Sequence, residues 1–118
     1  MKRQEREKVM TNGYYQLKAY GETYNVRPVR THYCNNNALA ILLVEDTGEQ
    51  FAVITVNLEE TNMFTNPALA FIDTNNCDWA EDFLKENNLA KPAGYYGHSG
   101  WCTYPLYMFD MEKIPAEE

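Results

Sequence analysis

The sequence predicts an α+β domain: a mainly antiparallel sheet of about five to six strands, with one amphipathic helix at about residues 76–88 packed on one face. Short apolar or alternating runs separated by turn residues recur along most of the chain, which is typical of antiparallel strands. One segment, after residue 75, changes to helical spacing. A chain of 118 residues can bury one hydrophobic core, so we expect a single domain, residues 1–118.

The first strands are expected soon after the N-terminus. Residues 1–10 carry mixed charges and are expected to form either a short helix or a frayed leader. Thr-Asn-Gly at 11–13 is a turn signal, and the first strand is expected over residues 14–20. The next β-prone run, 22–33, contains Pro28. Because proline lacks a backbone N–H, this run is expected to be an edge strand or to contain a bulge.

The middle of the chain holds the most apolar runs. Three asparagines at 35–37 predict a hairpin turn into residues 38–45, which are expected to form a central strand, although a buried helix also fits. Residues 46–49 predict a second turn. Apolar side chains occur on both faces of residues 50–59, which predicts one strand in the middle of the sheet. A further short strand is expected over residues 68–73.

The predicted helix follows. An asparagine is expected to cap it, with acidic residues in the first turn, where the helix dipole favours negative charge. Trp79 and Phe83 are four residues apart and therefore share the face expected to pack on the sheet. The pair at 87–88, Asn-Asn, predicts the end of the helix. A loop over 94–102 and a last aromatic strand, ending at Phe109, complete the chain.

The net charge of −7 arises entirely in residues 60–118, where three Lys face ten Asp and Glu. This disfavours direct binding of nucleic acid, because phosphate contacts require clustered Lys and Arg. An acidic face instead favours a basic protein partner, including a nucleic-acid-binding protein, while simple solubility is the alternative explanation. The residues expected on this face are Glu60, Asp73, Asp78, Glu81, Asp82, Glu86 and Asp110.

The segment 94–102 is the loop with the most functional character. Its three glycines permit close backbone approach, and aromatic and polar side chains surround them. It precedes a strand and follows a helix, the reverse of a dinucleotide-binding motif, so no cofactor is expected. A glycine-rich connection shaped by packing is the alternative. The candidate binding residues are Asn75, Asn76, Tyr95, Tyr96, His98, Ser99, Trp101, Cys102 and Tyr104.

Three cysteines, Cys34, Cys77 and Cys102, raise the question of thiol chemistry. No pair has a usual zinc-ligand spacing, so no metal site is expected. Cys77 precedes the predicted helix, where the helix N-terminus would lower the pKa of a thiol. A catalytic pair of Cys102 or Cys77 with His98 is the alternative, although no catalytic residue is assigned.

Location is predicted from the same features. Free thiols fit a reducing compartment. No apolar run is long enough to span a membrane, and the charged N-terminus lacks the apolar core of a signal peptide. We therefore expect a cytoplasmic protein without membrane contact.

Four segments occur in a recognisable order: FAVITVNL at 51–58, FIDTNN at 71–76, DWAEDFLKENNL at 78–89 and KPAGYYGHSGWCTYPLYMFD at 91–110. They resemble an uncharacterised bacterial family, domain of unknown function 4313. The resemblance implies an association with gut bacteria and with conjugative or phage-like elements, and it implies no activity, cofactor or catalytic residue. It makes motif positions of Asn75, Asn76, Ser99, Gly100, Cys102, Tyr104 and Pro105.

The expected function is therefore a small acidic, non-enzymatic interaction protein, an accessory or modulator of a mobile genetic element, with a protein as its partner. One alternative is an acidic nucleic-acid mimic that inhibits a host defence nuclease, as anti-restriction and anti-CRISPR proteins do. A second alternative, from a different class, is a small hydrolase or transferase that depends on Cys and His.

Overall fold

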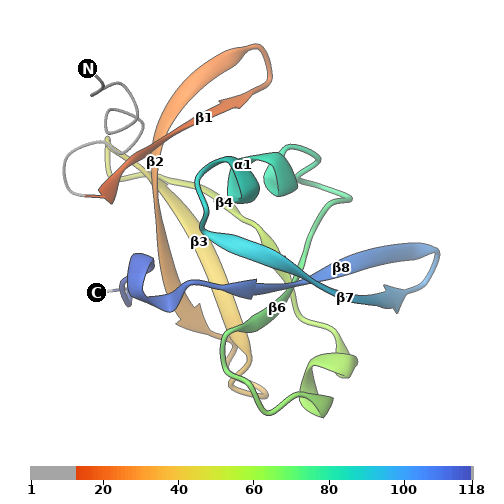
Figure 1. The fold of residues 1–118 in the computed structure, drawn as a ribbon. Coiled ribbons are helices and arrows are strands. Elements are labelled where there is room, and N and C mark those ends of the chain that lie inside the picture. The colour runs from red at the N-terminus through yellow and green to blue at the C-terminus, as the bar shows by residue number, and fades with distance from the viewer. Residues whose placement is uncertain (1–12, 118) are drawn as a thin grey trace.

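Two four-stranded antiparallel sheets and one short α-helix make up residues 13–117, the part of the chain described by this computed structural model (Figure 1). The α+β class is confirmed, whereas the expected single sheet of about five to six strands is wrong, because the described residues form two separate sheets. The first sheet has the order β1-β2-β3-β4, with bounds Tyr15–Ala19, Glu22–His32, Leu39–Glu45 and Gln50–Val53. The second has the order β5-β6-β8-β7, with bounds Thr55–Val56, Leu69–Ile72, Cys102–Phe109 and Ala90–Ser99.

The β1–β2 hairpin closes through a two-residue turn, Tyr20-Gly21. Both residues have positive φ, 56° and 76°, which is the backbone of the mirror-image turns that suit twisted hairpins. Glycine adopts this conformation freely, whereas a tyrosine there carries strain on the order of 1–2 kcal/mol. The expected first strand is confirmed, although Tyr20 lies in the turn after it.

The expectation that Pro28 marks an edge strand or a bulge is wrong. β2 lies between β1 and β3, and its pairing with β3 runs through Pro28 without a register shift. The explanation is the length of β1, whose first residue, Tyr15, pairs with Val26. Backbone groups two residues apart in a strand point to the same side, so the position of the missing N–H of Pro28 and the amide of Arg30 both face away from β3. The amide of Arg30 donates to the carbonyl of Pro115, not to β1. The missing donor of Pro28 therefore falls just beyond the end of β1.

Residues 50–59 do not form one strand in the middle of a sheet. They cross from the edge of the first sheet, as β4, to the edge of the second, as β5. Ile54 is the crossing point: its N–H donates to Ile41 in β3, and its carbonyl accepts from Asp73 after β6. The side chain of Ile54 is fully buried. Both faces of this segment are apolar because it lies between two sheets.

Side chains of β8 pack into two apolar clusters, one on each face of the second sheet. Tyr107 and Phe109 belong to the main core, which lies between the sheets and the helix α1, Ala80–Glu86. Tyr104 and Leu106 point to the opposite face. They form the second cluster, which consists of Leu58, Phe71, Tyr104 and Leu106.

The helix α1 is shorter than the predicted span of 76–88, although its packing is as expected. Trp79 and Phe83 are buried in the main core. The asparagine cap is wrong: Trp79 occupies the N-cap without a side-chain cap. The carboxylate of Asp73 instead accepts from the amide of Asn76, which holds the residues before Trp79 in turns. The predicted C-terminal end is confirmed, with Asn88 left-handed at a φ of 55°.

The remaining connections follow the sequence closely. The turns at 34–37 and 46–49 close the β2–β3 and β3–β4 hairpins, and Asn37 has the left-handed φ that asparagine tolerates. Two 3₁₀ turns follow β5 and β8: η3, Glu59–Met63, and η4, Met111–Lys113. The predicted helix or leader at 1–10 lies outside the described residues.

Candidate functional site

The predicted loop 94–102 is a β-hairpin, which corrects the expectation from sequence. β7 extends to Ser99, β8 begins at Cys102, and these two residues pair across the turn. Only Gly100 and Trp101 remain as the turn, and Gly100 supplies the positive φ of 60°. Gly94 lies in a bulge and Gly100 in the turn. In a sequence, glycines at a bulge and at a tight turn give the same signal as glycines in an irregular loop, which is why a loop was expected.

At the tip of this hairpin the side chain of Trp101 is fully exposed, with a relative exposure of 103%. Tyr96 is 59% exposed on β7. Tryptophan and tyrosine bury large areas and are the residues most often found at the energetic centre of protein interfaces. Among the predicted binding residues, those at and beside the tip therefore expose the most aromatic surface.

Strand alternation divides the other candidates between two faces. Gly97 pairs with Tyr104 and Ser99 with Cys102, so these four share the face that carries the second cluster. Tyr104 is buried there, and Cys102 packs against it in a half-buried position. His98 pairs with Thr103 on the opposite face and is exposed.

Tyr95 is set apart by a bulge. The register of β7 shifts between Pro92 and Tyr96, and Gly94 has a φ of 82° within the shift. The ring of Tyr95 then packs against Phe64, at 5.6 Å between centroids, and Phe71, at 6.2 Å. The contact with Phe64 is edge-on, at 78° between the ring planes, which is a favoured geometry of aromatic pairs, and the contact with Phe71 is tilted at 52°. Tyr95 is therefore packed on one side, although 40% of it remains exposed.

The candidate catalytic pair of His98 and Cys102 is not assembled. Because the two side chains leave opposite faces of the hairpin, the thiol cannot receive a hydrogen bond from the imidazole in this arrangement. Within residues 13–117 there is also no group of three or more His, Cys, Asp or Glu placed to hold a metal ion.

The expectation of a lowered pKa for Cys77 is wrong. Cys77 lies in the main core, near the carbonyl of Val53. The pKa of its thiol is raised to about 11, chiefly by burial and in smaller part by the nearby carboxylates of Asp73 and Asp78. The helix begins three residues later than Cys77, too far along the chain for its N-terminus to dominate.

Several of the predicted acidic residues accept hydrogen bonds from other residues of the chain. Glu60 accepts from the amide of His98, and Glu81 accepts from the hydroxyl of Tyr107. Asp73 accepts from both the amide and the side chain of Asn76, which lies beside Asn75 in an exposed turn. These carboxylates help to hold elements together, so negative charge alone does not define their role.

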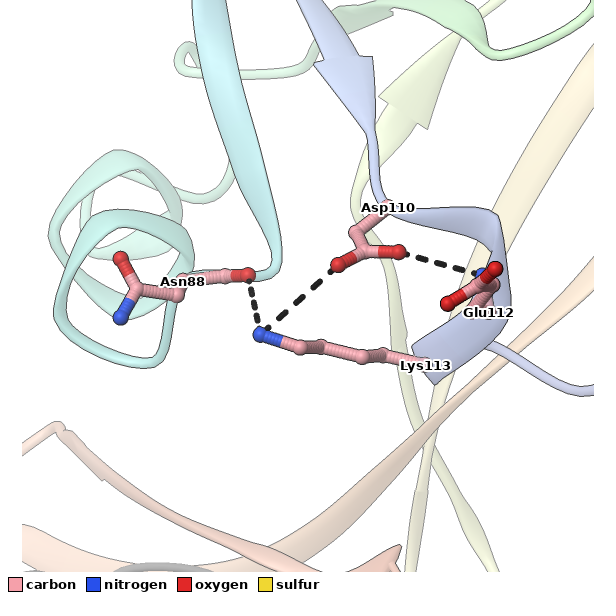
Figure 2. A network of polar contacts seen from close by, with 4 residues as sticks. All are labelled: Asn88, Asp110, Glu112 and Lys113. Atoms are coloured by element: carbon pink, nitrogen blue, oxygen red, sulfur yellow. Dashed lines mark hydrogen bonds and ion pairs between the residues drawn. The ribbon is translucent and has the colours of Figure 1, made fainter.

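Asp110 belongs to a further network, shown in Figure 2. Its carboxylate accepts from the amide of Glu112 and lies 3.8 Å from the ammonium group of Lys113. Lys113 also donates to the carbonyl of Asn88, just after α1. This network fixes the C-terminal turn against the end of the helix, and it partly neutralises Asp110.

A groove between β1 and α1 was missed by the sequence analysis. It has a volume of about 520 Å³, and Asp82 and Glu86 of α1 line it, both exposed. Figure 1 shows α1 lying beside the β1–β2 hairpin. The other lining residues are Gln16, Leu17, Lys18, Trp79, Phe83 and Asn87. The alternation of exposed and buried residues identifies β1 as a strand. It does not show that α1 lies across the groove from this strand.

Comparison with known proteins identifies a family and adds no chemistry. The family model of the domain of unknown function (DUF4313) matches residues 29–116. The chain belongs to this family, and the match extends on both sides of the segment, 51–110, that carries the resemblance. No curated protein and no solved structure matches the chain significantly. No helix within residues 13–117 is long and apolar enough to cross a membrane.

Proposed function

We propose that this protein is a non-enzymatic interaction protein that binds a protein partner through the exposed tip of the β7–β8 hairpin. The observation that carries the proposal is the fully exposed indole of Trp101. Leaving so large an apolar side chain in water forgoes roughly 1.5–3 kcal/mol of burial free energy, which a partner can recover. Tyr96 adds a second aromatic ring on the adjoining strand.

The hairpin is suited to present these rings rigidly. Gly97, beside them in β7, lies so close to Leu58 and Phe71 that a Cβ there would force one of these side chains to shift. Glu60 binds the amide of His98 from η3. A rigid anchor loses little conformational entropy on binding, which favours affinity.

The charge of the chain favours a basic partner. The net charge of −7 makes association with a positively charged protein faster and more selective. A nucleic-acid-binding protein has such a surface, so inhibition of a defence nuclease is one specific form of this function. The association with conjugative or phage-like elements that the resemblance implies is the reason for proposing a cytoplasmic accessory role in such an element.

Co-purification with the full chain from a lysate of its native bacterium, followed by crosslinking, tests the proposal. We expect a partner that the wild-type protein and Met63→Ala retain and that Trp101→Ala loses. Met63 is the matched control because it is 70% exposed but lies on η3. Trp101→Ala should change the free energy of unfolding by less than about 0.5 kcal/mol. A partner retained equally by Trp101→Ala, or no partner at all, would contradict the proposal.

A further inference from the structure

We infer that the groove between β1 and α1 binds an extended, basic segment of a partner protein, which adds a strand to the free edge of β1. This goes beyond the proposed function, because it uses a different surface and assigns the conformation and charge of the ligand. Three observations carry it: the outer edge of β1, with which no residue among 13–117 pairs, the apolar wall of the groove and its carboxylates.

The backbone of β1 presents hydrogen-bonding groups to the groove. β1 is the first strand of its sheet, and Gln16 pairs with Asn25 of β2. The carbonyl of Asn25 accepts from the amide of Asp46, on the β3 side, so Asn25 points away from β1. In an antiparallel pair both partners of such a position point outward. The N–H and C=O of Gln16 therefore face away from β2, and those of Lys18 do the same.

Among residues 13–117, no backbone or side-chain group hydrogen-bonds to these four outward groups. Unpaired groups of an edge strand are a template for a further strand, and extended peptides bind many domains in this way. Each new hydrogen bond adds affinity without regard to sequence. Specificity must then come from the walls of the groove.

One wall of the groove is apolar where it meets the start of α1. Trp79 and Phe83 line it, and both side chains are also packed in the main core, so they form a fixed surface. The Nε1 of Trp79 is held by the hydroxyl of Tyr20. An added strand points alternate side chains towards such a wall, which accommodates an apolar residue at every second position.

The other contribution is negative charge. Asp82 and Glu86 are four residues apart on α1, so they lie on the same face of the helix, and both line the groove. Lys18 is the one basic residue among the lining residues. This balance favours Lys or Arg in the bound segment. A second copy of the chain is the less favourable occupant, because two molecules of net charge −7 repel each other.

The probe is an acetylated, amidated peptide of four Lys-Val repeats, titrated into the full-length isotope-labelled chain and followed by NMR. We expect saturable binding, with slowed hydrogen exchange of the amides of Gln16 and Lys18. A Glu-Val peptide should bind at least tenfold more weakly. A Lys-Val peptide that is N-methylated at every residue has the same charge but cannot add a strand, because it has no backbone N–H to donate in either register. It should also bind at least tenfold more weakly.

Variants of the protein test the same two contributions. Asp82→Asn combined with Glu86→Gln should weaken binding of the Lys-Val peptide at least fivefold. The matched control, Glu49→Gln combined with Glu117→Gln, removes the same charge from residues outside the groove and should leave binding within twofold. Gln16→Pro removes an N–H that points away from β2, so the pairing of β1 with β2 is kept. This variant should abolish the peptide-induced slowing of hydrogen exchange at Lys18.

Three results would overturn the inference. The first is an absence of saturation up to about 1 mM peptide. The second is equal binding of the Lys-Val peptide and its fully N-methylated form, which would reduce the effect to charge alone. The third is a dimer in light scattering that Gln16→Pro converts to a monomer, since this would assign the edge to a second copy of the chain. None of these outcomes bears on Trp101, so the proposed function is tested separately.

Discussion

The indole N–H of Trp79 donates a hydrogen bond of 2.9 Å to the hydroxyl of Tyr20, which links the start of α1 to the turn of the β1–β2 hairpin. The centroid of the Phe51 ring lies 5.6 Å from the centroid of the Trp79 ring and 6.4 Å from that of the Tyr20 ring. A tyrosine with positive φ is strained, and this contact gives a reason for its presence there. The bond also fixes the tryptophan that lines the groove.

Removing this hydroxyl should destabilise the protein. We expect Tyr20→Phe to lower the free energy of unfolding by about 0.5–1.5 kcal/mol, since the partly buried indole N–H loses its acceptor while the ring contacts remain. Urea denaturation followed by tryptophan fluorescence measures the change. Tyr96→Phe is the control, because Tyr96 is largely exposed, and it should have no measurable effect. Equal stability of both variants would show that the bond contributes nothing.

A side chain at Gly97 is expected to destabilise the protein. A methyl group there would lie 2.7 Å from Leu58 and 2.7 Å from Phe71, well inside van der Waals contact. We therefore expect Gly97→Ala to destabilise the protein by about 1–3 kcal/mol through overpacking of the second cluster. Thermal unfolding measures the effect, and His98→Ala, on the exposed face of the same strand, should change stability by less than about 0.5 kcal/mol. An unchanged melting temperature for Gly97→Ala would contradict this packing.

The hydroxyl of Tyr107 donates to Glu81 over 2.7 Å, and this bond joins the fully buried centre of β8 to α1. Burial raises the pKa of Tyr107 well above its usual value, as does the hydrogen bond to Glu81. We expect Tyr107→Phe to cost about 1–3 kcal/mol, because a charge-assisted bond is lost. Glu81→Gln keeps an acceptor oxygen and should cost less. A double-mutant cycle in urea measures the coupling, and a value near zero would contradict a direct bond.

The sequence predicted most elements of this fold because their signals are local. The apolar run at 38–45, the turns beside it and the four-residue spacing of Trp79 and Phe83 each determine a short piece of structure. All of these elements are present. The crossing at Ile54 was not predictable, because apolar residues on both faces look the same in a central strand and in one that passes between two sheets.

The candidate site was predicted less completely for a related reason. Trp101 and Tyr96 were among the expected binding residues, and the structure leaves both exposed. The groove depends on which strand edge faces α1, which is a long-range property of topology. Gln16 and Lys18 carry no local signal for it. The misplaced expectation for Cys77 has the same origin, since burial, not chain position, determines its pKa.

The thiol of Cys77 should make stability depend on alkaline pH. Its pKa is about 11 in the folded protein against an ordinary value of 9.0, so the unfolded chain releases this proton first. Between these two values the unfolded state therefore binds fewer protons than the folded state. The free energy of unfolding then falls as the pH rises. The contribution of Cys77 is fully present below pH 9 and is lost progressively towards pH 11.

Urea denaturation of the wild-type protein and Cys77→Ala at pH 7, 9 and 10 isolates this contribution. Burial also raises the pKa of Tyr15 and Tyr24, so some loss of stability at high pH is common to both proteins. We expect the wild-type protein to lose stability more steeply than Cys77→Ala between pH 9 and 10, because only the wild type has the buried thiol. At pH 7 the variant should be the less stable of the two, since it leaves a small cavity. Parallel curves for the two proteins would mean that the thiol ionises at its ordinary pKa, and the burial of Cys77 in the main core would then be wrong.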